Sequence, residues 1–241
     1  MKKYTYDEKE HLLNWLQMVA SDAKIFGTGG RWRELEELIQ IKKATVDEFS
    51  AVVRGTDYLL DKEGHSFKEY ILVNIGTGTS IFHVRDHSFE RITGTGIGGG
   101  TWLGLGSLLA NGNNFYELNE LAKTGNRLKS DLLVKDIYGD MNSPLAGEMT
   151  AANFGKAHLS SDQTIHDQLR ALAQMIGEVI VSLAGNAAVG KKIGEIVFIG
   201  TTLEGNSIFR DVLASFQPLL PYRPIFIHEG AYAGAIGAVL E

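Results

Sequence analysis

Residues 70–106, YILVNIGTGTSIFHVRDHSFERITGTGIGGGTWLGLG, decide the fold of this chain. The run 70–75 is short, apolar and rich in β-forming residues, which is typical of a buried strand. The turn GTGTS interrupts it, and residues 81–84 predict a returning strand. A denser glycine stretch follows, with glycine at 94, 96, 98, 99, 100, 104 and 106. Because glycine costs conformational entropy, this density predicts positive φ angles or close approach of the backbone to another group, for which an oxygen-rich ligand is one candidate.

Two interpretations of these glycine turns are open from the residues alone. Turn preferences make segment 76–80 an ordinary hairpin closure, whereas its glycines and hydroxyls also suit binding of phosphate oxygens. Segment 94–99 has the spacing G-x-G-x-x-G, but it lacks the βαβ unit and the acidic residue about 20 positions on that dinucleotide binding requires. No G-x-x-x-x-G-K-[ST] phosphate loop occurs in the chain. Two glycine turns flanking a hairpin therefore indicate a different nucleotide-binding design.

The composition is that of an ordinary globular protein and excludes several classes. The 241 residues are 44% apolar and 22% charged, and the formal charge of −6 argues against nucleic acid or an anionic membrane as the main partner. The chain has no cysteine, which excludes disulfides and thiolate catalysis. We find no signal peptide, no apolar run near the roughly 18 residues of a membrane span, and no histidine pattern of a zinc site. We therefore expect a cytoplasmic protein without membrane contact and without a metal held by its own side chains.

Alternation of strands and helices in the second half predicts a parallel α/β layer. Residues 163–189 carry apolar side chains at steps of three and four, so we expect one long helix there. Residues 195–199 predict a buried strand, 206–216 a helix and 225–227 a further strand. A strand, helix and strand in succession are typical of parallel strands joined by a helical connection.

The first part of the chain contains one candidate catalytic carboxylate. A helix is expected from residue 47 to residue 60, with Glu48 in its first turn, where the helix dipole favours a negative charge. Glu48 is either a carboxylate that stabilises the helix start or a general base that orients or deprotonates a substrate hydroxyl. Polar residues 62–68 mark the expected boundary between lobes. Near the end of the chain, the glycines of 230–237 predict either helix–helix packing or close approach to a flat nucleotide base.

Taken together, these segments resemble the type II pantothenate kinases, members of the acetate and sugar kinase, Hsp70 and actin superfamily. The matching segments occur in family order over nearly the whole chain: TGG at 28–30, EF at 48–49, VNIGTGTS at 73–80, RITGTGIGGG at 91–100, LAKTGNR at 121–127, MTAANFG at 149–155, IVFIGTT at 196–202 and EGAYAGAIGA at 229–238. The resemblance implies a two-lobed, ribonuclease H-like α/β fold. Residues 1–69 would form an N-terminal lobe joined by the helix 230–241, and residues 70–229 a C-terminal lobe with the glycine-rich loops and the long helix.

The resemblance also implies a reaction, the ATP-dependent phosphorylation of pantothenate to 4'-phosphopantothenate, which is the first step of coenzyme A biosynthesis. By position, Glu48 resembles the catalytic base, and Arg91 a residue that stabilises charge on the transferring phosphoryl group. Both would contact pantothenate together with Thr93 and Gly94. The residues expected at the nucleotide are Gly76, Thr77, Gly78, Gly99, Gly100, Thr101, Trp102, Leu103, Phe115 and Thr201. The resemblance further implies Mg²⁺ bound with ATP and a homodimer formed through the long helix region.

One element that the family shares does not occur in this sequence. Its members open with a strand and a D-x-G-G-T turn, whose aspartate helps to place magnesium, and the chain contains no D-x-G-G-T. We therefore expect a fold without the first β-hairpin, explained by a start codon assigned too far downstream, by a truncated chain, or by a homologue that binds ligand without catalysing transfer. A kinase for another small hydroxylated substrate, such as an amino sugar, is a further hypothesis on the same scaffold.

Overall fold

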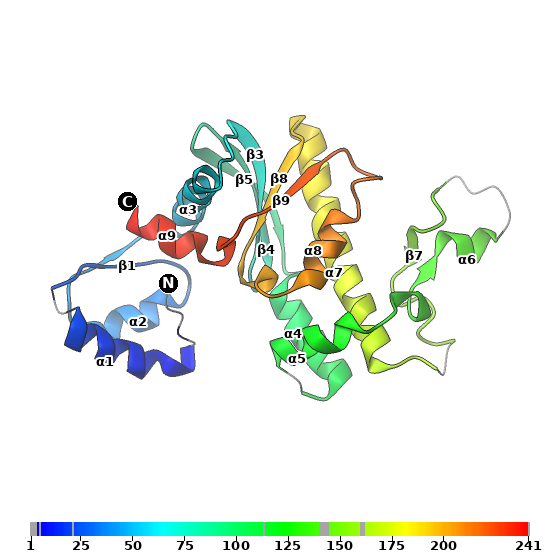
Figure 1. The fold of residues 1–241 in the computed structure, drawn as a ribbon, viewed down its shortest axis with the longest axis horizontal. Helices are drawn as coiled ribbons and strands as arrows, with labels where there is room; N and C mark the ends of the chain where they lie inside the picture. Colours follow the sequence, from blue (N-terminus) through cyan, green and yellow to red (C-terminus); the bar gives the residue numbers. More distant parts are fainter. Residues whose placement is uncertain are drawn as a thin grey trace. The chain divides into compact units, whose positions relative to one another are not determined.

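The computed structural model describes residues 4, 6–20, 22–112, 114–139, 145–159 and 162–240. The chain divides into two compact units. Unit 1 comprises residues 1–66 and 227–241, and unit 2 comprises residues 67–226. The chain therefore enters unit 2 once and returns to unit 1 once, so that its first and last segments belong to the same unit (Figure 1).

Within the described residues, unit 2 is built on a five-stranded sheet in the order β5-β4-β3-β8-β9. The strands are β3 (Glu69–Ile75), β4 (Thr79–Arg85), β5 (Ser88–Thr95), β8 (Glu195–Ile199) and β9 (Arg223–Phe226). The first three form an antiparallel meander, and β8 lies parallel to β3 on one side and to β9 on the other. The predicted hairpin and the predicted parallel strands are confirmed. The sequence does not predict β5, because SFERITGT shows no regular alternation of apolar residues.

Helix α7 (Ile165–Lys191) supplies much of the core of unit 2 and confirms the predicted long helix. It begins with a capping box, in which the Thr164 hydroxyl and the Asp167 carboxylate each accept from the other's backbone amide. Its buried side chains Leu169, Leu172, Ile176 and Ile180 belong to one hydrophobic cluster with residues of β3 and β8. The other helices packed against α7 are α4 (Gly99–Ala110), α5 (Phe115–Lys123) and α8 (Ser207–Ala214) (Figure 1).

Helix α7 also corrects one expectation drawn from the sequence, which was that no apolar run reaches the length of a membrane span. By length and composition alone, α7 is apolar enough to cross a membrane. However, 56% of its most apolar window is buried inside the protein, where it packs against β3, β8 and α8. Packing in the core therefore accounts for the apolar character of this helix.

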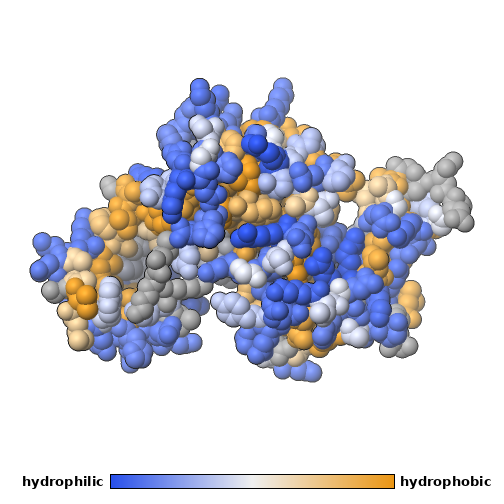
Figure 2. Space-filling view, in the orientation of Figure 1, coloured by the Kyte–Doolittle hydropathy of each residue, from blue (hydrophilic) through white to orange (hydrophobic). Residues whose placement is uncertain are grey.

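The remaining elements of unit 2 are short. A second sheet pairs β6 (Leu132–Leu133) with β7 (Thr150–Ala152) in antiparallel orientation. The short helix η2 (Arg127–Lys129) precedes β6 in the chain, and helix α6 (Val134–Tyr138) follows it. A further short helix, η3 (Thr201–Leu203), follows β8. Hydrophilic side chains predominate on the face shown in Figure 2, and hydrophobic ones are interspersed among them, as is usual for a globular protein surface.

Unit 1 combines helices with a short parallel strand pair, β1 with β2. Its elements in chain order are η1 (Tyr6–Glu8), α1 (Lys9–Val19), β1 (Ile25–Gly27), α2 (Trp32–Leu38), β2 (Lys43–Thr45), α3 (Glu48–Lys62), η4 (Gly230–Tyr232) and α9 (Ala233–Val239). The helix predicted from residue 47 to residue 60 is thus confirmed as α3. The indole of Trp32 donates to the Thr45 hydroxyl at 2.8 Å, which ties α2 to β2.

Helices α3 and α9 lie side by side in unit 1 although they are far apart in the sequence (Figure 1). A Cβ atom on Gly55 of α3 would lie 1.8 Å from the carbonyl oxygen of Ala233, and one on Gly237 of α9 would lie 1.8 Å from that of Ala51. Both positions therefore require glycine for the two backbones to meet. Of the two interpretations of the terminal glycines, helix–helix packing is the one observed at Gly237.

Candidate active site

The two glycine segments identified in the sequence lie against each other in unit 2. The amide of Gly99 donates to the carbonyl oxygen of Gly76 at 2.8 Å, and the amide of Gly100 donates to that of Thr77 at 2.8 Å. The turn between β3 and β4 is itself closed by a 2.9 Å hydrogen bond from the Gly76 amide to the Gly78 carbonyl. The first turn of α4 is therefore anchored on the β3–β4 turn, and five of the residues predicted at the nucleotide are neighbours.

Glycine is needed where these segments touch because their backbones approach closely. A Cβ atom on Gly78 would lie 2.7 Å from the carbonyl oxygen of Thr95, and one on Gly98 would lie 2.8 Å from that of Gly78. Gly98 is extended, with φ at 177°, so lack of space rather than backbone torsion excludes a side chain there. Of the two reasons that the glycine density predicts, close approach therefore applies, and the group approached is the neighbouring loop.

The same hydrogen bonds orient the turn. No cis peptide bond occurs among the described residues, and in a planar trans peptide the C=O group and the following N–H group point in opposite directions. Because the carbonyl groups of Gly76 and Thr77 are directed at the start of α4, the amides of Thr77 and Gly78 point to the opposite side of the turn. Thr77 is exposed. On the side away from α4, the turn thus presents N–H donors rather than carbonyl oxygens to an approaching anion.

Arg91, Thr93 and Gly94 lie on β5, beside this turn. The β4–β5 ladder shifts register next to Ile81, which pairs with Thr93, whereas the following residue of β4 pairs with Arg91. Such a bulge re-aims the side chains around it. A Cβ atom on Gly94 would lie 2.2 Å from Nη2 of Arg91, so the guanidinium group lies directly over the Gly94 backbone. The structure brings Arg91 and Gly94 together, and their contact with pantothenate stays a prediction.

Thr101 and Trp102 follow in the first turn of α4. The Thr101 hydroxyl donates to the carbonyl of Gly96 at 3.1 Å and accepts from the amide of Gly98 at 3.3 Å. It therefore fixes the residues that directly precede the helix. The Trp102 side chain is fully buried, and its ring meets that of Phe209 edge-on with 5.5 Å between centroids. Only the backbone of Trp102 could therefore face a nucleotide.

The other three residues predicted at the nucleotide occupy separate elements of unit 2. Leu103 on α4 is 42% exposed. Phe115 is the first residue of α5 and is half-buried, with its ring edge-on to that of Tyr116. Thr201 is exposed at the start of η3, immediately after β8. Contact of all three with a nucleotide stays a prediction.

Glu48 in unit 1 is the first residue of α3. The helix is capped by its neighbour Asp47, whose side chain accepts from the amide of Ser50 at 2.9 Å; this bond lowers the pKa of Asp47. Glu48 is therefore not needed as the cap, and its side chain is exposed. A Cβ atom on Gly29 would lie 3.9 Å from Glu48 Oε2, so the structure places the candidate base beside the TGG turn at 28–30.

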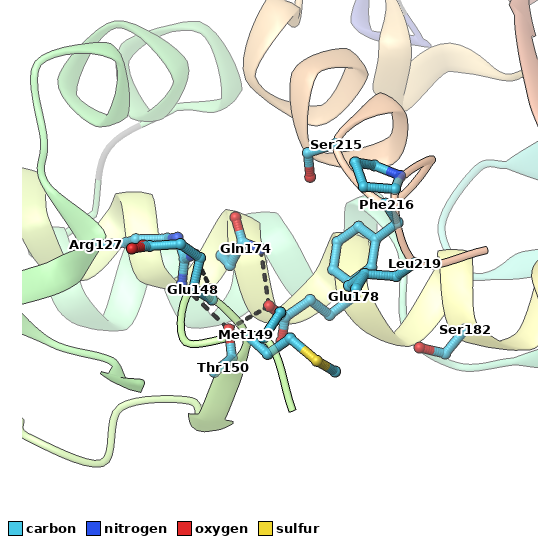
Figure 3. A pocket seen from close by; sticks show the side chains of 12 residues that line it. Arg127, Glu148, Met149, Thr150, Gln174, Glu178, Ser182, Ser215, Phe216 and Leu219 are labelled. Carbon is cyan, nitrogen blue, oxygen red and sulfur yellow. Dashed lines mark hydrogen bonds between the residues drawn. The ribbon is translucent and has the colours of Figure 1, made fainter. Parts of the chain in front are cut away.

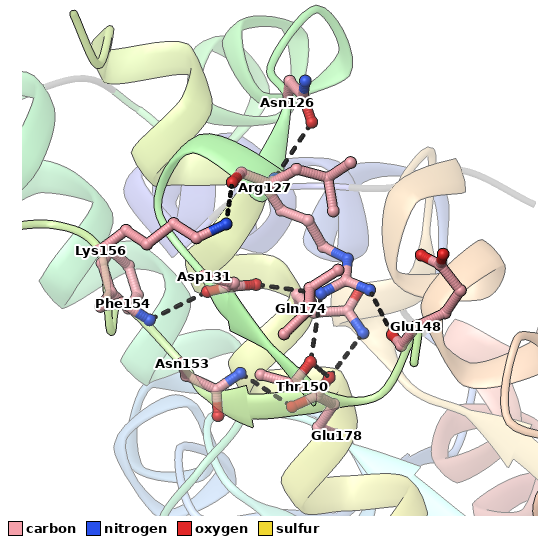
Figure 4. A network of polar contacts seen from close by, with 12 residues as sticks. Asn126, Arg127, Asp131, Glu148, Thr150, Asn153, Phe154, Lys156, Gln174 and Glu178 are labelled. Atoms are coloured by element: carbon pink, nitrogen blue, oxygen red, sulfur yellow. Dashed lines mark hydrogen bonds and ion pairs between the residues drawn. The ribbon is translucent and has the colours of Figure 1, made fainter. Parts of the chain in front are cut away.

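Arg127 and Glu178 belong to a polar cluster for which the sequence predicts no role (Figure 4). Several of its residues come from the family segments LAKTGNR and MTAANFG. Arg127 Nη1 donates to the Thr150 hydroxyl at 3.1 Å and to Asp131 Oδ2 at 3.3 Å. Glu178 on α7 accepts from the hydroxyl of Thr150, from Asn153 at 2.8 Å and from Gln174 at 2.8 Å. The cluster fastens β7 to α7. In the sequence, only the polar residues of these two motifs could have indicated it.

A cavity of about 450 Å³ opens beside this cluster (Figure 3). Arg127 and Gln174 lie on one side of it in this view, with Phe216 and Leu219 across from them. The residues of the glycine turns do not line it. The cavity combines a polar wall with an apolar one, which is usual for small-molecule pockets, and it is distinct from the predicted nucleotide site.

Among the described residues, no group of three or more His, Asp or Glu side chains is placed to hold a metal ion. Magnesium that accompanies a nucleotide commonly takes one or two carboxylates and completes its shell with phosphate oxygens and water. Within the described residues, a magnesium ion would therefore have to take most of its ligands from a nucleotide and from water.

Comparison with solved structures identifies the fold. Component A of (R)-2-hydroxyglutaryl-CoA dehydratase from Acidaminococcus fermentans aligns with a TM-score of 0.57 at 16% identity, over 88% of this chain and 73% of that one. The ROK hexokinase from Thermus thermophilus aligns with a TM-score of 0.52 at 13% identity, over 100% of this chain and 87% of that one. The fold is that of the acetate and sugar kinase, Hsp70 and actin-like proteins, as the sequence predicts.

Comparison of sequences identifies the family. The model of the Fumble family matches residues 4–241. The type II pantothenate kinase of Oceanobacillus iheyensis is 45% identical over 242 residues, which cover 100% of this chain and 90% of that protein. The type II pantothenate kinase of Bacillus cereus strain AH820 is 37% identical over 99% of this chain and 88% of that protein. The chain therefore belongs to the Fumble family, the family of the type II pantothenate kinases.

Proposed function

We propose that this protein transfers the γ-phosphoryl group of ATP to the primary hydroxyl of pantothenate, forming 4'-phosphopantothenate in the first step of coenzyme A biosynthesis. The observation that carries the proposal is the 45% identity to a type II pantothenate kinase over the whole chain. The geometry of the β3–β4 turn supports it, because this turn directs the backbone amides of Thr77 and Gly78 away from α4, where they can donate to phosphate oxygens.

In this proposal the ATP phosphates bind at Thr77 and at the amides of Thr77 and Gly78. Gly99 and Gly100 act as spacers, since their own amides are engaged by the turn. Thr101, Leu103, Phe115, Thr201 and the backbone of Trp102 contribute the rest of the nucleotide site. Magnesium bound to ATP would neutralise part of the phosphate charge. Arg91, which lies over Gly94, binds pantothenate with Thr93 and stabilises charge on the transferring group.

Glu48 is the proposed general base. As the pantothenate hydroxyl oxygen bonds to the γ-phosphorus, the bond from phosphorus to the β,γ-bridging oxygen breaks, ADP leaves, and the hydroxyl proton passes to the Glu48 carboxylate. An exposed carboxylate that does not cap its helix is suited to this task. Proton transfer by a positioned side chain contributes about 10²- to 10⁴-fold to the rate.

The test is transfer of labelled γ-phosphate from ATP to pantothenate by the full chain, with Glu48→Gln as the decisive variant. We expect turnover by the wild type and a loss of about 100-fold or more in Glu48→Gln, whereas Glu37→Gln, which alters an exposed carboxylate on α2, should match the wild type. Unchanged turnover in Glu48→Gln would remove the assignment of the base. Binding of ATP and pantothenate without turnover by the wild type would support the non-catalytic homologue instead, and transfer only to another small alcohol in a substrate panel would support a kinase of different specificity.

Assembly and location complete the proposal: a homodimer formed through the region of α7, acting in the cytoplasm. The dimer is tested by light scattering of the purified chain across a concentration series. A mass of one chain, 26.4 kDa, at all concentrations would contradict it. Fractionation of the source cells, followed by assay of pantothenate phosphorylation in each fraction, tests the location.

A further inference from the structure

A third segment of unit 2 meets the two glycine turns. The chain leaves β8 through Gly200, whose φ of +115° favours glycine and whose Cβ would lie 2.3 Å from the carbonyl oxygen of Ile75. Thr202 follows in η3 and is only 2% exposed. Its hydroxyl donates to the carbonyl oxygen of Gly76 at 3.0 Å. The end of β8 is thereby connected to the end of β3 through a side chain as well as through the sheet.

The carbonyl oxygen of Gly76 consequently accepts two hydrogen bonds, one from the Gly99 amide at 2.8 Å and one from Thr202 Oγ1 at 3.0 Å. A carbonyl oxygen has two lone pairs, so both are used. Turn 76–78, the start of α4 and η3 therefore converge on one atom. Thr202 is packed tightly into this junction, since a Cβ atom on Gly99 would lie 2.3 Å from its hydroxyl oxygen.

We propose that Thr202 is a positioning residue of the phosphate-binding turn, and this inference rests on the proposed function of that turn. Glycine has few torsional limits of its own, so a Gly76 carbonyl held by one partner could rotate about that bond. A second donor in another direction fixes the plane of the peptide that joins Gly76 to Thr77. Because this peptide is trans, fixing its carbonyl also fixes the direction of the Thr77 amide.

Thr202 itself is too buried to touch the nucleotide. Its hydroxyl acts through the Gly76 peptide, and its β-branched side chain has few alternative rotamers, which makes it a suitable anchor. Thr201, its exposed neighbour, was the residue that the sequence motif indicated. The structure assigns the two threonines different tasks, with Thr202 holding the turn from the inside.

The test compares variants of the full chain that differ in the hydroxyl alone. Thr202→Val keeps the shape and removes the hydroxyl, whereas Thr202→Ser keeps the hydroxyl. The primary readout is the dissociation constant of ADP, measured by calorimetry, because it does not depend on the identity of the phosphoryl acceptor. We expect ADP to bind about tenfold more weakly to Thr202→Val than to the wild type, a loss typical of one buried hydrogen bond. The dissociation constant of ADP for Thr202→Ser should lie within twofold of the wild-type value.

Thr56→Val is the matched control, since Thr56 is also fully buried and its hydroxyl donates to the Val52 carbonyl within α3 at 2.7 Å. It should lower stability to a similar extent without changing ADP affinity. If Thr202→Val does not fold, Thr202→Ala and Thr202→Ser form the comparison, again differing in one hydroxyl. ADP affinity equal to the wild type in a folded Thr202→Val, or equal losses in the Ala and Ser variants, would overturn the proposal.

A second readout separates this inference from the proposed function. In the pantothenate assay, Thr202→Val should raise the KM for ATP about tenfold and leave the KM for pantothenate unchanged, which a general loss of stability would not do. If the wild type does not phosphorylate pantothenate, the proposed function fails, yet the ADP comparison still decides whether Thr202 positions the turn.

Discussion

The guanidinium group of Arg127 lies 3.1 Å from the hydroxyl of Thr150 and donates a hydrogen bond to it, across 23 residues of sequence. The same group reaches Asp131 Oδ2 at 3.3 Å. Asp131 has no exposed side-chain surface, whereas Arg127 is 20% exposed. Burial raises the pKa of Asp131, although hydrogen bonds from the Phe154 amide and from Arg127 act in the opposite direction. Arg127 therefore compensates for a buried carboxylate that also holds the segment after β7.

Replacing Arg127 with methionine, which keeps the length and removes the charge, should destabilise the protein by about 3 kcal/mol at pH 7, because it leaves the Asp131 carboxylate buried without its partner. The pKa of Asp131 is already raised, and losing the guanidinium raises it further, so the folded state binds a proton more readily than the unfolded chain. The difference in free energy of unfolding between wild type and variant should therefore shrink as the pH falls towards 4. Urea unfolding at pH 7 and pH 4.5 measures it, and an equal difference at both values would contradict the expectation.

Gly99→Ala should disable the phosphate-binding turn without unfolding α4. Its Cβ would lie 2.3 Å from the Thr202 hydroxyl oxygen and 2.9 Å from the Gly76 carbonyl oxygen, so one of the three segments must move. A displacement near 1 Å at a positioning element costs about 100-fold in rate, and we expect a loss of that order in kcat/KM for ATP. Gly104→Ala in the same helix has no atom within 4 Å of its new Cβ and should retain wild-type kinetics. Equal kinetics in both variants would mean that the junction at Gly76 does not govern catalysis.

Gly55→Ala should separate α3 from α9 in unit 1. The added methyl group would lie 1.8 Å from the Ala233 carbonyl oxygen and 2.9 Å from the Gly237 amide nitrogen, so it would clash with backbone that cannot rotate away. Overpacking of this kind costs about 3 kcal/mol, visible as a lower midpoint in urea unfolding followed by circular dichroism. Gly190→Ala near the end of α7 is the control, because its Cβ would meet no atom within 4 Å; alanine should leave stability unchanged or raise it by up to about 1 kcal/mol.

Because of Asp167, the free energy of unfolding of the protein should depend on pH below about pH 4. Burial acts to raise its pKa, but hydrogen bonds from the Asn126 amide and from Thr164 outweigh it and lower the pKa from 3.8 to about 2. The lowered value means that the carboxylate stabilises the fold fully above about pH 4 and loses this contribution as the pH falls through 2. Asp167→Asn should therefore be less stable than the wild type at pH 5, with a difference that diminishes between pH 4 and pH 2. Parallel urea titrations at several pH values check this, and a difference that grows in acid would contradict it.

Local patterns predicted what depends on neighbours in the chain. The hairpin of β3 and β4 and the long helix α7 both follow from periodicity and from turn residues a few positions apart. The sequence did not predict strand β5, because a bulge and Gly94 interrupt the alternation of its side chains. The ordered motifs also identified the family, since their combination over the whole chain is specific where each alone is not.

By itself, the sequence determined the α/β class, the family, the glycine segments around which the candidate site is built, and the positions of β3, β4, β8, β9, α3 and α7. Only the tertiary structure decided that these glycines serve contact between loops, that Trp102 belongs to the core, that Thr202 closes the junction at Gly76, and that Arg127, Thr150 and Glu178 form one cluster. The physical reason is that periodicity and propensity act over a few residues. A hydrogen bond between Thr202 and Gly76 joins positions 126 residues apart, and packing of the sheet and α7 determines which distant groups meet.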